Sequence, residues 1–270
     1  MKTLKNHTLI YDNECPMCNI YSKGFTKCGM LDESGREAFS ELSENNKNLI
    51  DFNRAKNEIA LVNHNKNTVV YGLDSLLLIM GNSFPVLEKI ARIQPLYWFF
   101  KKLYSFVSYN RKQIVPSEKD YQEQSCVPDF NLKYRLLYLG FVVFASSYVL
   151  SAFTSKLGFG LQQNYTRELA ICLGQILWQT LFLSLYLQEK LWDYLGNMMT
   201  VSLIGTLLLI PVLMFDFIIL FNQIYFGIVV FIMFLEHLRR CKILKLNLFP
   251  TISWMMFRMT VLTILILLSR

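Results

Sequence analysis

Residues 8–18 read Thr-Leu-Ile-Tyr-Asp-Asn-Glu-Cys-Pro-Met-Cys, and this stretch decides the fold of the first half of the chain. Its first four residues are mostly apolar, as is typical of a short buried strand. The Asp-Asn-Glu segment that follows has the composition of a tight turn. Pro16 is favoured at the first position of a helix, where its missing N–H needs no partner. We therefore predict a strand, a turn, and a helix whose first turn carries Cys15 and Cys18.

Cys15 and Cys18 form the most informative pair in the sequence. Two cysteines three positions apart on the first helical turn can approach closely enough to form a disulfide, and the helix dipole stabilises a thiolate on the first of them. We expect Cys15, at the helix edge, to attack a disulfide, and the less exposed Cys18 to resolve the mixed disulfide. The charge of Glu14 should oppose thiolate formation, so we expect only a modest lowering of the Cys15 pKa.

Asp12 is the third candidate site residue. It lies three positions before Cys15, at the end of the predicted strand, where a partly buried carboxylate is placed to exchange a proton with the resolving thiol. An aspartate that only shapes the turn or caps the helix is an equally supported alternative.

The remaining cysteines provide no second pair at zinc-finger spacing, which favours a redox site over a metal half-site. They are Cys28, Cys126, Cys172 and Cys241. For Cys28 and Cys126 we favour lone thiols over a second disulfide. We predict neither a metal nor a cofactor.

The rest of the first half predicts an α/β domain with its own core. We predict helices over residues 36–44, 74–80, 85–93 and 95–109, and strands over 49–52, 58–62 and 68–71, with a hairpin turn at 63–67. The run from Leu96 to Tyr104 is rich in aromatic residues and contains Lys101 and Lys102. Packing of this run against the sheet is favoured over an alternative in which it lies on a membrane surface.

The second half is dominated by apolar segments. Five of them approach the roughly 20 residues that a helix needs to cross the hydrocarbon core of a bilayer. They lie at about residues 136–153, 168–187, 195–214, 217–235 and 251–269. We therefore predict a thioredoxin-like domain over 1–128 and an all-α transmembrane bundle of about five helices over 129–270.

Basic residues at the edges of these segments predict the orientation. With five spans and the N-terminus in the cytoplasm, seven flanking Lys and Arg lie inside and three outside. The inside set is Lys133, Arg135, Lys190, Arg239, Arg240, Lys242 and Lys245, and the outside set is Lys156, Arg167 and Arg270. This bias follows the positive-inside rule. The net charge of +7 is therefore interpreted as a topology signal, and we predict no nucleic-acid partner.

Asp12-x-x-Cys15-x-x-Cys18 after a short strand resembles the DCC family of predicted thiol-disulfide oxidoreductases, which is named after this pattern. The resemblance extends over roughly residues 7–128. The segment Val69–Leu76 is similar to the family's strand, glycine and helix start, and Tyr104–Arg111 to its closing helix. The resemblance implies a thioredoxin-like fold and dithiol chemistry. Unlike ordinary thioredoxins, the chain has no proline between Pro16 and Pro85 to stand beside the disulfide.

Together these features predict a membrane-anchored thiol-disulfide oxidoreductase in a bacterial inner membrane, with its N-terminal domain in the cytoplasm. Its expected partners are a protein thiol or disulfide or an electron donor, the lipid bilayer, and a membrane-protein complex. Two alternatives remain open at this level: a membrane assembly or scaffold subunit whose thioredoxin-like domain serves for docking or redox sensing, and a redox-gated transporter.

Overall fold

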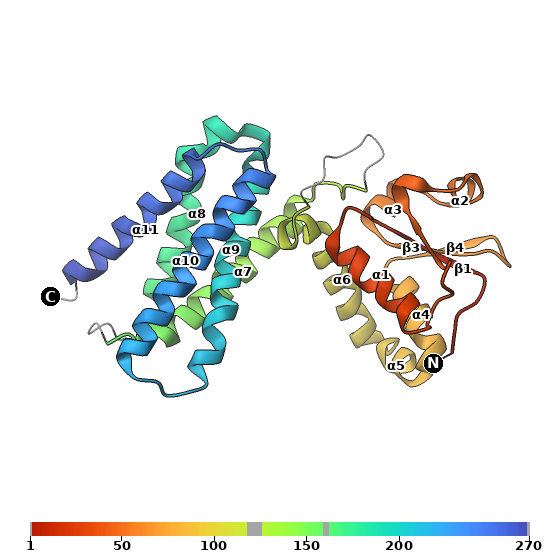
Figure 1. Cartoon of the computed structure of the whole chain (residues 1–270), viewed down its shortest axis with the longest axis horizontal. Helices are drawn as coiled ribbons and strands as arrows, with labels where there is room; N and C mark the ends of the chain where they lie inside the picture. Colours follow the sequence, from red (N-terminus) through yellow and green to blue (C-terminus); the bar gives the residue numbers. More distant parts are fainter. Residues whose placement is uncertain (1, 118–125, 159–161, 269–270) are drawn as a thin grey trace. The chain divides into compact units, whose positions relative to one another are not determined.

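A computed structural model describes residues 2–117, 126–158 and 162–268 (Figure 1). The chain forms two compact units, Met1–Tyr134 and Arg135–Arg270. The domain boundary predicted between residues 128 and 129 stays a prediction, and Arg270 of the charge count lies outside the described residues.

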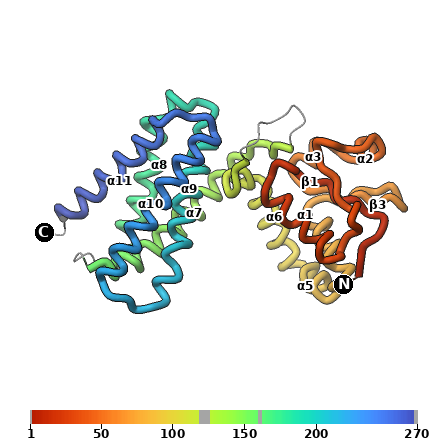
Figure 2. The backbone as a smooth tube through the Cα atoms, viewed as in Figure 1, coloured from red at the N-terminus to blue at the C-terminus, as the bar shows by residue number. Residues whose placement is uncertain are grey.

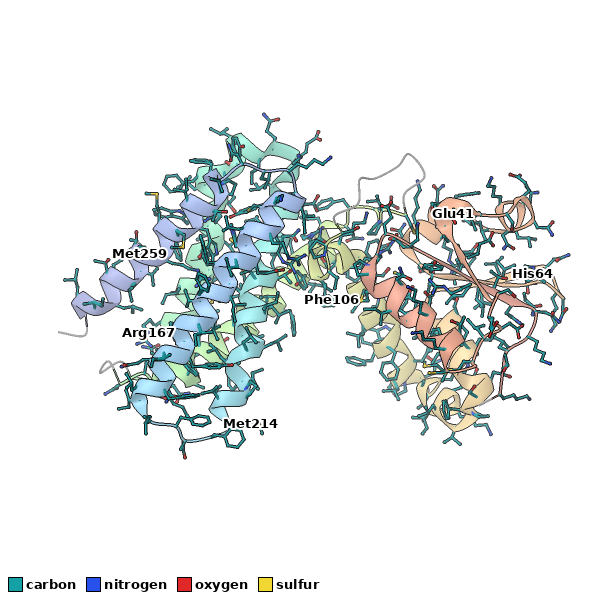
Figure 3. The ribbon with its side chains drawn as sticks, in the orientation of Figure 1. Glu41, His64, Phe106, Arg167, Met214 and Met259 are labelled. Atoms are coloured by element: carbon teal, nitrogen blue, oxygen red, sulfur yellow. The ribbon has the colours of Figure 1, made fainter. Side chains whose placement is uncertain are left out.

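A four-stranded mixed sheet organises the first unit. Its strands are β1 (His7–Tyr11), β2 (Arg36–Ala38), β3 (Ala60–Asn63) and β4 (Thr68–Tyr71), in the order β2-β1-β3-β4. β1 pairs in parallel with β2 and antiparallel with β3, which forms a hairpin with β4. The predicted first strand and hairpin are confirmed. Figure 2 traces the backbone through this sheet, and Figure 3 shows His64 at the hairpin turn.

Helices cover both faces of the sheet. They are α1 (Pro16–Lys27), α2 (Glu44–Leu49), α3 (Phe52–Asn57), α4 (Leu73–Ser83), α5 (Pro85–Ala91) and α6 (Gln94–Ile114), with a short 3-10 turn at Phe39–Glu41. Leu9 and Leu61 point to one face and pack with residues of α1, α4 and α6. Ile10 and Val62 point to the other face and pack with residues of the α2–α3 segment. This alternation along β1 and β3 gives the unit two small cores.

Two predictions of secondary structure in this unit are wrong. Residues 36–44 were expected as a helix, but they form the edge strand β2 and the 3-10 turn. Residues 49–52 were expected as a strand, but they end α2 and begin α3, where the Asp51 side chain accepts hydrogen bonds from the backbone N–H groups of Asn53 and Arg54. Both segments are short, and tertiary contacts of Phe39 and Ile50 in the second core outweigh their weak local pattern.

The second unit is a bundle of long helices. They are α7 (Leu132–Thr154), α8 (Tyr165–Leu187), α9 (Leu191–Leu213), α10 (Ile219–Ile243) and α11 (Phe249–Leu268). Four helical segments in the described part of the chain are long and apolar enough to cross a membrane. One of them, Tyr165–Leu213, contains both α8 and α9, which are joined by a 3-10 turn where Gln188 has φ +43°. The predicted bundle of about five apolar helices is confirmed, and it supports an integral membrane protein.

Hydrogen bonds between side chains join helices of the bundle. The Tyr138 hydroxyl of α7 lies 2.7 Å from the Thr200 hydroxyl of α9, and Thr206 of α9 donates to Ser146 of α7 at 2.9 Å. Such pairs satisfy polar groups that hydrocarbon cannot solvate. The Arg258 guanidinium lies 4.1 Å from the ring centre of Trp254 on the same helix.

Candidate active site

The dithiol lies where β1 passes into α1. Cys15 is the N-cap of the helix, with an extended backbone, and Pro16 takes the first helical position as predicted. The Asp12 carboxylate accepts hydrogen bonds from the backbone N–H groups of Glu14 at 3.0 Å and of Cys15 at 3.2 Å. Asp12 therefore shapes the turn that presents the first cysteine.

Both thiols are buried. Cys15 is 3% exposed and Cys18 is 6% exposed, so the structure buries both to a similar extent and does not expose Cys15 at the edge of the helix. The Asp12 carboxylate that accepts the hydrogen bond from the Cys15 N–H is buried as well. A cavity of about 190 Å³ lies on the inner side of the motif, and Cys18 lines it together with Asp12 and Arg111.

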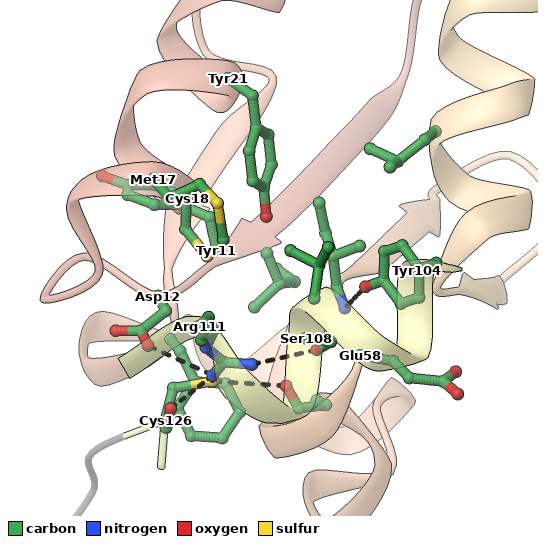
Figure 4. A pocket seen from close by; sticks show the side chains of 16 residues that line it. Tyr11, Asp12, Met17, Cys18, Tyr21, Glu58, Tyr104, Ser108, Arg111 and Cys126 are labelled. Atoms are coloured by element: carbon green, nitrogen blue, oxygen red, sulfur yellow. Dashed lines mark hydrogen bonds and ion pairs between the residues drawn. The ribbon is translucent and has the colours of Figure 1, made fainter. Parts of the chain in front are cut away.

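Arg111, near the end of α6, supplies a positive charge to this region (Figure 4). Its guanidinium is buried and lies 3.3 Å from the Asp12 carboxylate. The same Nη2 atom donates to the carbonyls of Cys126 at 2.6 Å and of Lys56 at 3.0 Å. Hydrogen bonds that this cation donates to acceptors in three chain segments therefore hold it in place. Arg111 and Asp12 are 99 residues apart in the sequence, so no local sequence pattern predicts their pairing.

The environment makes the two thiols unequal. The hydrogen bond from the Cys18 thiol lowers the pKa of Cys15 to about 7, helped by the Cys18 backbone N–H and the charge of Arg111, and against burial and the charge of Asp12. The same hydrogen bond, together with burial, raises the pKa of Cys18. Cys15 is thus the better thiolate, as expected, although the acidic group that opposes it is Asp12 where the sequence suggested Glu14.

Two tyrosines that the sequence analysis did not single out complete the site. Tyr21, one turn after Cys18 on α1, forms a hydrogen bond with the Cys18 thiol, and burial raises the pKa of this phenol well above its usual value. The Tyr104 hydroxyl of α6 accepts a hydrogen bond from the Ile59 N–H at 3.0 Å. The spacing of three residues between Cys18 and Tyr21 is the signal that would have identified Tyr21.

Residues 126–131, which follow α6 in the chain, contact the site through Cys126. The Cys126 thiol lies 3.4 Å from both Arg111 Nη2 and the Ala55 carbonyl, and burial raises its pKa to about 11. Asp129 and Asn57 exchange two hydrogen bonds, at 2.7 and 2.8 Å. All six cysteines are free thiols in the structure, and Cys28, at the end of α1, is exposed.

Within the described ranges, no group of three or more His, Cys, Asp or Glu side chains is arranged to hold a metal ion. The pair itself is an asymmetric dithiol: a thiol with a lowered pKa, a partner thiol with a raised pKa, and the buried Arg111 cation in the same cavity lining as Cys18.

A mixed βαβββ-type sheet with a dithiol at the start of its first helix defines a thioredoxin-like domain. Residues 9–116 match the model of the DCC1-like thiol-disulfide oxidoreductase family, which confirms for this segment the resemblance seen in the sequence motif. The match covers less than half of the 270 residues and leaves the apolar helices outside it. Comparison with curated proteins and with solved structures gave no match.

Proposed function

We propose that the chain is a membrane-anchored thiol-disulfide oxidoreductase in which Cys15 and Cys18 carry the redox reaction. The observation that supports this most directly is the unequal dithiol at the start of α1, beside Arg111, within the region that matches the oxidoreductase family. A dithiol with one acidic member reacts faster with disulfides than two ordinary cysteines do.

In the first step, the Cys15 thiolate attacks one sulfur of a substrate disulfide. A mixed disulfide forms between Cys15 and the substrate, and the other substrate sulfur leaves as a thiolate. Pro16 and Ile20 are exposed on the same end of α1, with Ile20 74% exposed, and they give a protein substrate an apolar surface beside the nucleophile.

In the second step, Cys18 loses its proton and attacks the Cys15 sulfur. The Cys15–Cys18 disulfide forms, the second substrate sulfur leaves as a thiolate, and the substrate has gained two electrons. Asp12, which lines the same cavity as Cys18, is the proposed acceptor of the Cys18 proton, and Tyr21 hydrogen-bonds to the same sulfur. A dithiol donor then reduces the pair for the next cycle.

We place the N-terminal domain on the cytoplasmic face of a bacterial inner membrane. The positive-inside count supports this orientation, because basic residues gather at the start of α7, in the turn between α8 and α9, and at the end of α10.

Trapping tests this function. Cys18→Ser should leave a stalled mixed disulfide on Cys15, which non-reducing electrophoresis and mass spectrometry would detect and which would identify the partner. Cys15→Ser should lose reduction of a model protein disulfide to background, whereas Cys28→Ser, a control on the same helix, should retain it. Full activity of Cys15→Ser would refute the proposal and favour the scaffold alternative.

A further inference from the structure

Helices α5 and α6 leave a large apolar surface uncovered. Eight of the thirteen exposed large hydrophobic side chains among the described residues of the first unit fall between residues 84 and 103, and each is 39–68% exposed. They are Phe84, Val86, Leu87, Ile90, Ile93, Trp98, Phe99 and Leu103. Soluble domains rarely expose so many large apolar groups within one short segment. We call these eight residues the α5–α6 apolar face.

The residues follow the helical period. On α5, Val86, Leu87 and Ile90 lie at positions i, i+1 and i+4, which share one side of a helix. On α6, Trp98 and Phe99 lie one turn before the exposed Lys102. The aromatic run was expected to pack against the sheet; this holds for Tyr104 and is wrong for Trp98, Phe99 and Leu103, which are exposed.

Basic residues accompany this surface. Residues 84–103 contain Lys89, Arg92, Lys101 and Lys102 and a single acidic residue, Glu88, which is paired with Arg92. The ammonium group of Lys102 lies 6.0 Å from the Trp98 ring centre. Helices that lie in the interface of an anionic bilayer typically combine Trp, Phe and Leu with lysines, as this segment does.

The first turn of α7 lies beside α6 within the first unit. Tyr134, in the first turn of the apolar helix α7, stacks on Tyr109 of α6 with ring centres 4.9 Å apart. The Tyr134 carbonyl also accepts a hydrogen bond from the Asn110 side chain at 3.1 Å. At 1.5 Å per residue, Trp98 lies only about 17 Å along α6 from Tyr109. The first candidate span, Leu132–Thr154, therefore begins at a residue that is held against the same helix that carries Trp98 and Phe99.

From these observations we propose that the α5–α6 apolar face lies on the surface of the bilayer, with its aromatic and aliphatic side chains among the acyl chains and Lys89, Lys101 and Lys102 at anionic lipid phosphates. Neither the dithiol nor its reaction is needed for this contact.

Fluorescence of the full chain in vesicles tests the proposal. The Trp98 signal is the difference between wild type and Trp98→Phe, which removes the contribution of the other tryptophans. In vesicles of phosphatidylglycerol and phosphatidylcholine brominated near the headgroup, this signal should fall by roughly half, because interfacial helices sit about 5–10 Å into the headgroup boundary. Aqueous iodide should then quench Trp98 in vesicles much less than it quenches free tryptophan in detergent-free buffer.

A charge variant and a matched control sharpen the test. Lys89→Gln/Lys101→Gln/Lys102→Gln should weaken bromine quenching and restore iodide quenching, whereas Lys23→Gln/Lys27→Gln/Lys66→Gln, which removes three exposed lysines elsewhere in the unit, should not. Quenching of Trp98 by iodide and not by bromine would overturn the proposal. Protection from both would also overturn it, because a second copy or another protein surface would then cover the face.

Discussion

Asp12 and Arg111 act on Cys15 in opposite directions. The guanidinium favours the Cys15 thiolate, whereas the carboxylate disfavours it, and the two groups are 3.3 Å apart. Asp12 also holds the backbone N–H of Cys15, so the same side chain positions the nucleophile and limits its acidity. An asparagine at this position would keep the hydrogen-bond acceptor and remove the charge.

Asp12→Asn should therefore lower the pKa of Cys15 below its value of about 7, because the repulsion between carboxylate and thiolate disappears. The rate of Cys15 alkylation by iodoacetamide rises with pH as the thiolate forms, so the midpoint of that profile should move to lower pH. If Asp12 also accepts the Cys18 proton, the release of a mixed disulfide from Cys15 should slow in the same variant.

Glu14→Gln is the matched control for this variant, because it removes the acidic charge nearest to Cys15 in the sequence. Its alkylation profile should stay close to that of wild type. A shift in Glu14→Gln without one in Asp12→Asn would contradict the assignment of the opposing charge to Asp12.

The local sequence pattern was sufficient to bring together the residues of the dithiol turn. It was insufficient to predict the distant residues that contact them. Cys15, Cys18 and Asp12 lie within seven positions, and proline, turn and strand preferences place them together. Arg111 enters from another helix, 99 residues away, and one sequence holds no signal for that contact. The burial of Cys15 was missed for the same reason, since it depends on the fold around the turn.

At the scale of elements, side chains of α6 form hydrogen bonds with the backbone of residues 56–59, just before β3. Tyr104 accepts a hydrogen bond from the Ile59 N–H, Ser108 donates to the Asn57 carbonyl, and Arg111 donates to the Lys56 carbonyl. These three side chains lie at intervals of four and three residues and so share one side of the helix. The start of α6 and the place of β3 were predicted to within two residues, but α6 continues five residues beyond the predicted end, to Ile114. The edge strand β2, with three residues, carries too little pattern to be recognised.

Tyr104→Phe should loosen this contact. The variant removes the acceptor of the Ile59 N–H in a buried site, which costs about 1–3 kcal/mol. Hydrogen exchange of peptides from residues 58–63 in the full chain should become faster, with little change in the transmembrane helices. Tyr97→Phe, which removes a hydroxyl bonded to the Asp74 side chain, provides the control and should leave exchange at 58–63 unchanged. Equal exchange in both variants would contradict the proposed role of Tyr104.

At the scale of the whole molecule, the number of crossings depends on the segment Tyr165–Leu213. Its 49 residues would make a straight helix of roughly 74 Å, far longer than the hydrocarbon core of about 30 Å. The turn at Gln188–Lys190 divides it into α8 and α9, each of 23 residues. Each half is then long enough for one crossing.

Reporter fusions should therefore find five crossings. Reporters placed after Lys190 and after Lys245 should lie on the same side of the membrane as the N-terminal domain, and reporters placed after Lys156 and after Asp216 on the opposite side. These sites fall in the turns between helices. A reporter after Lys190 that lies on the side opposite to the N-terminal domain would contradict the division at Gln188–Lys190 and the prediction of five crossings.

The contacts of residues 126–131 limit where this domain can be joined to another protein in a chimera. Arg111 holds the Cys126 carbonyl and Asp129 pairs with Asn57, but both partners lie beyond residue 116, where the family match ends. A chimera joined at residue 116 would take the redox turn and α6 from this chain and lose the Cys126 carbonyl, one of the three acceptors that hold Arg111. A graft that keeps both contacts extends at least through Asp129, so it is longer than the segment that matches the family.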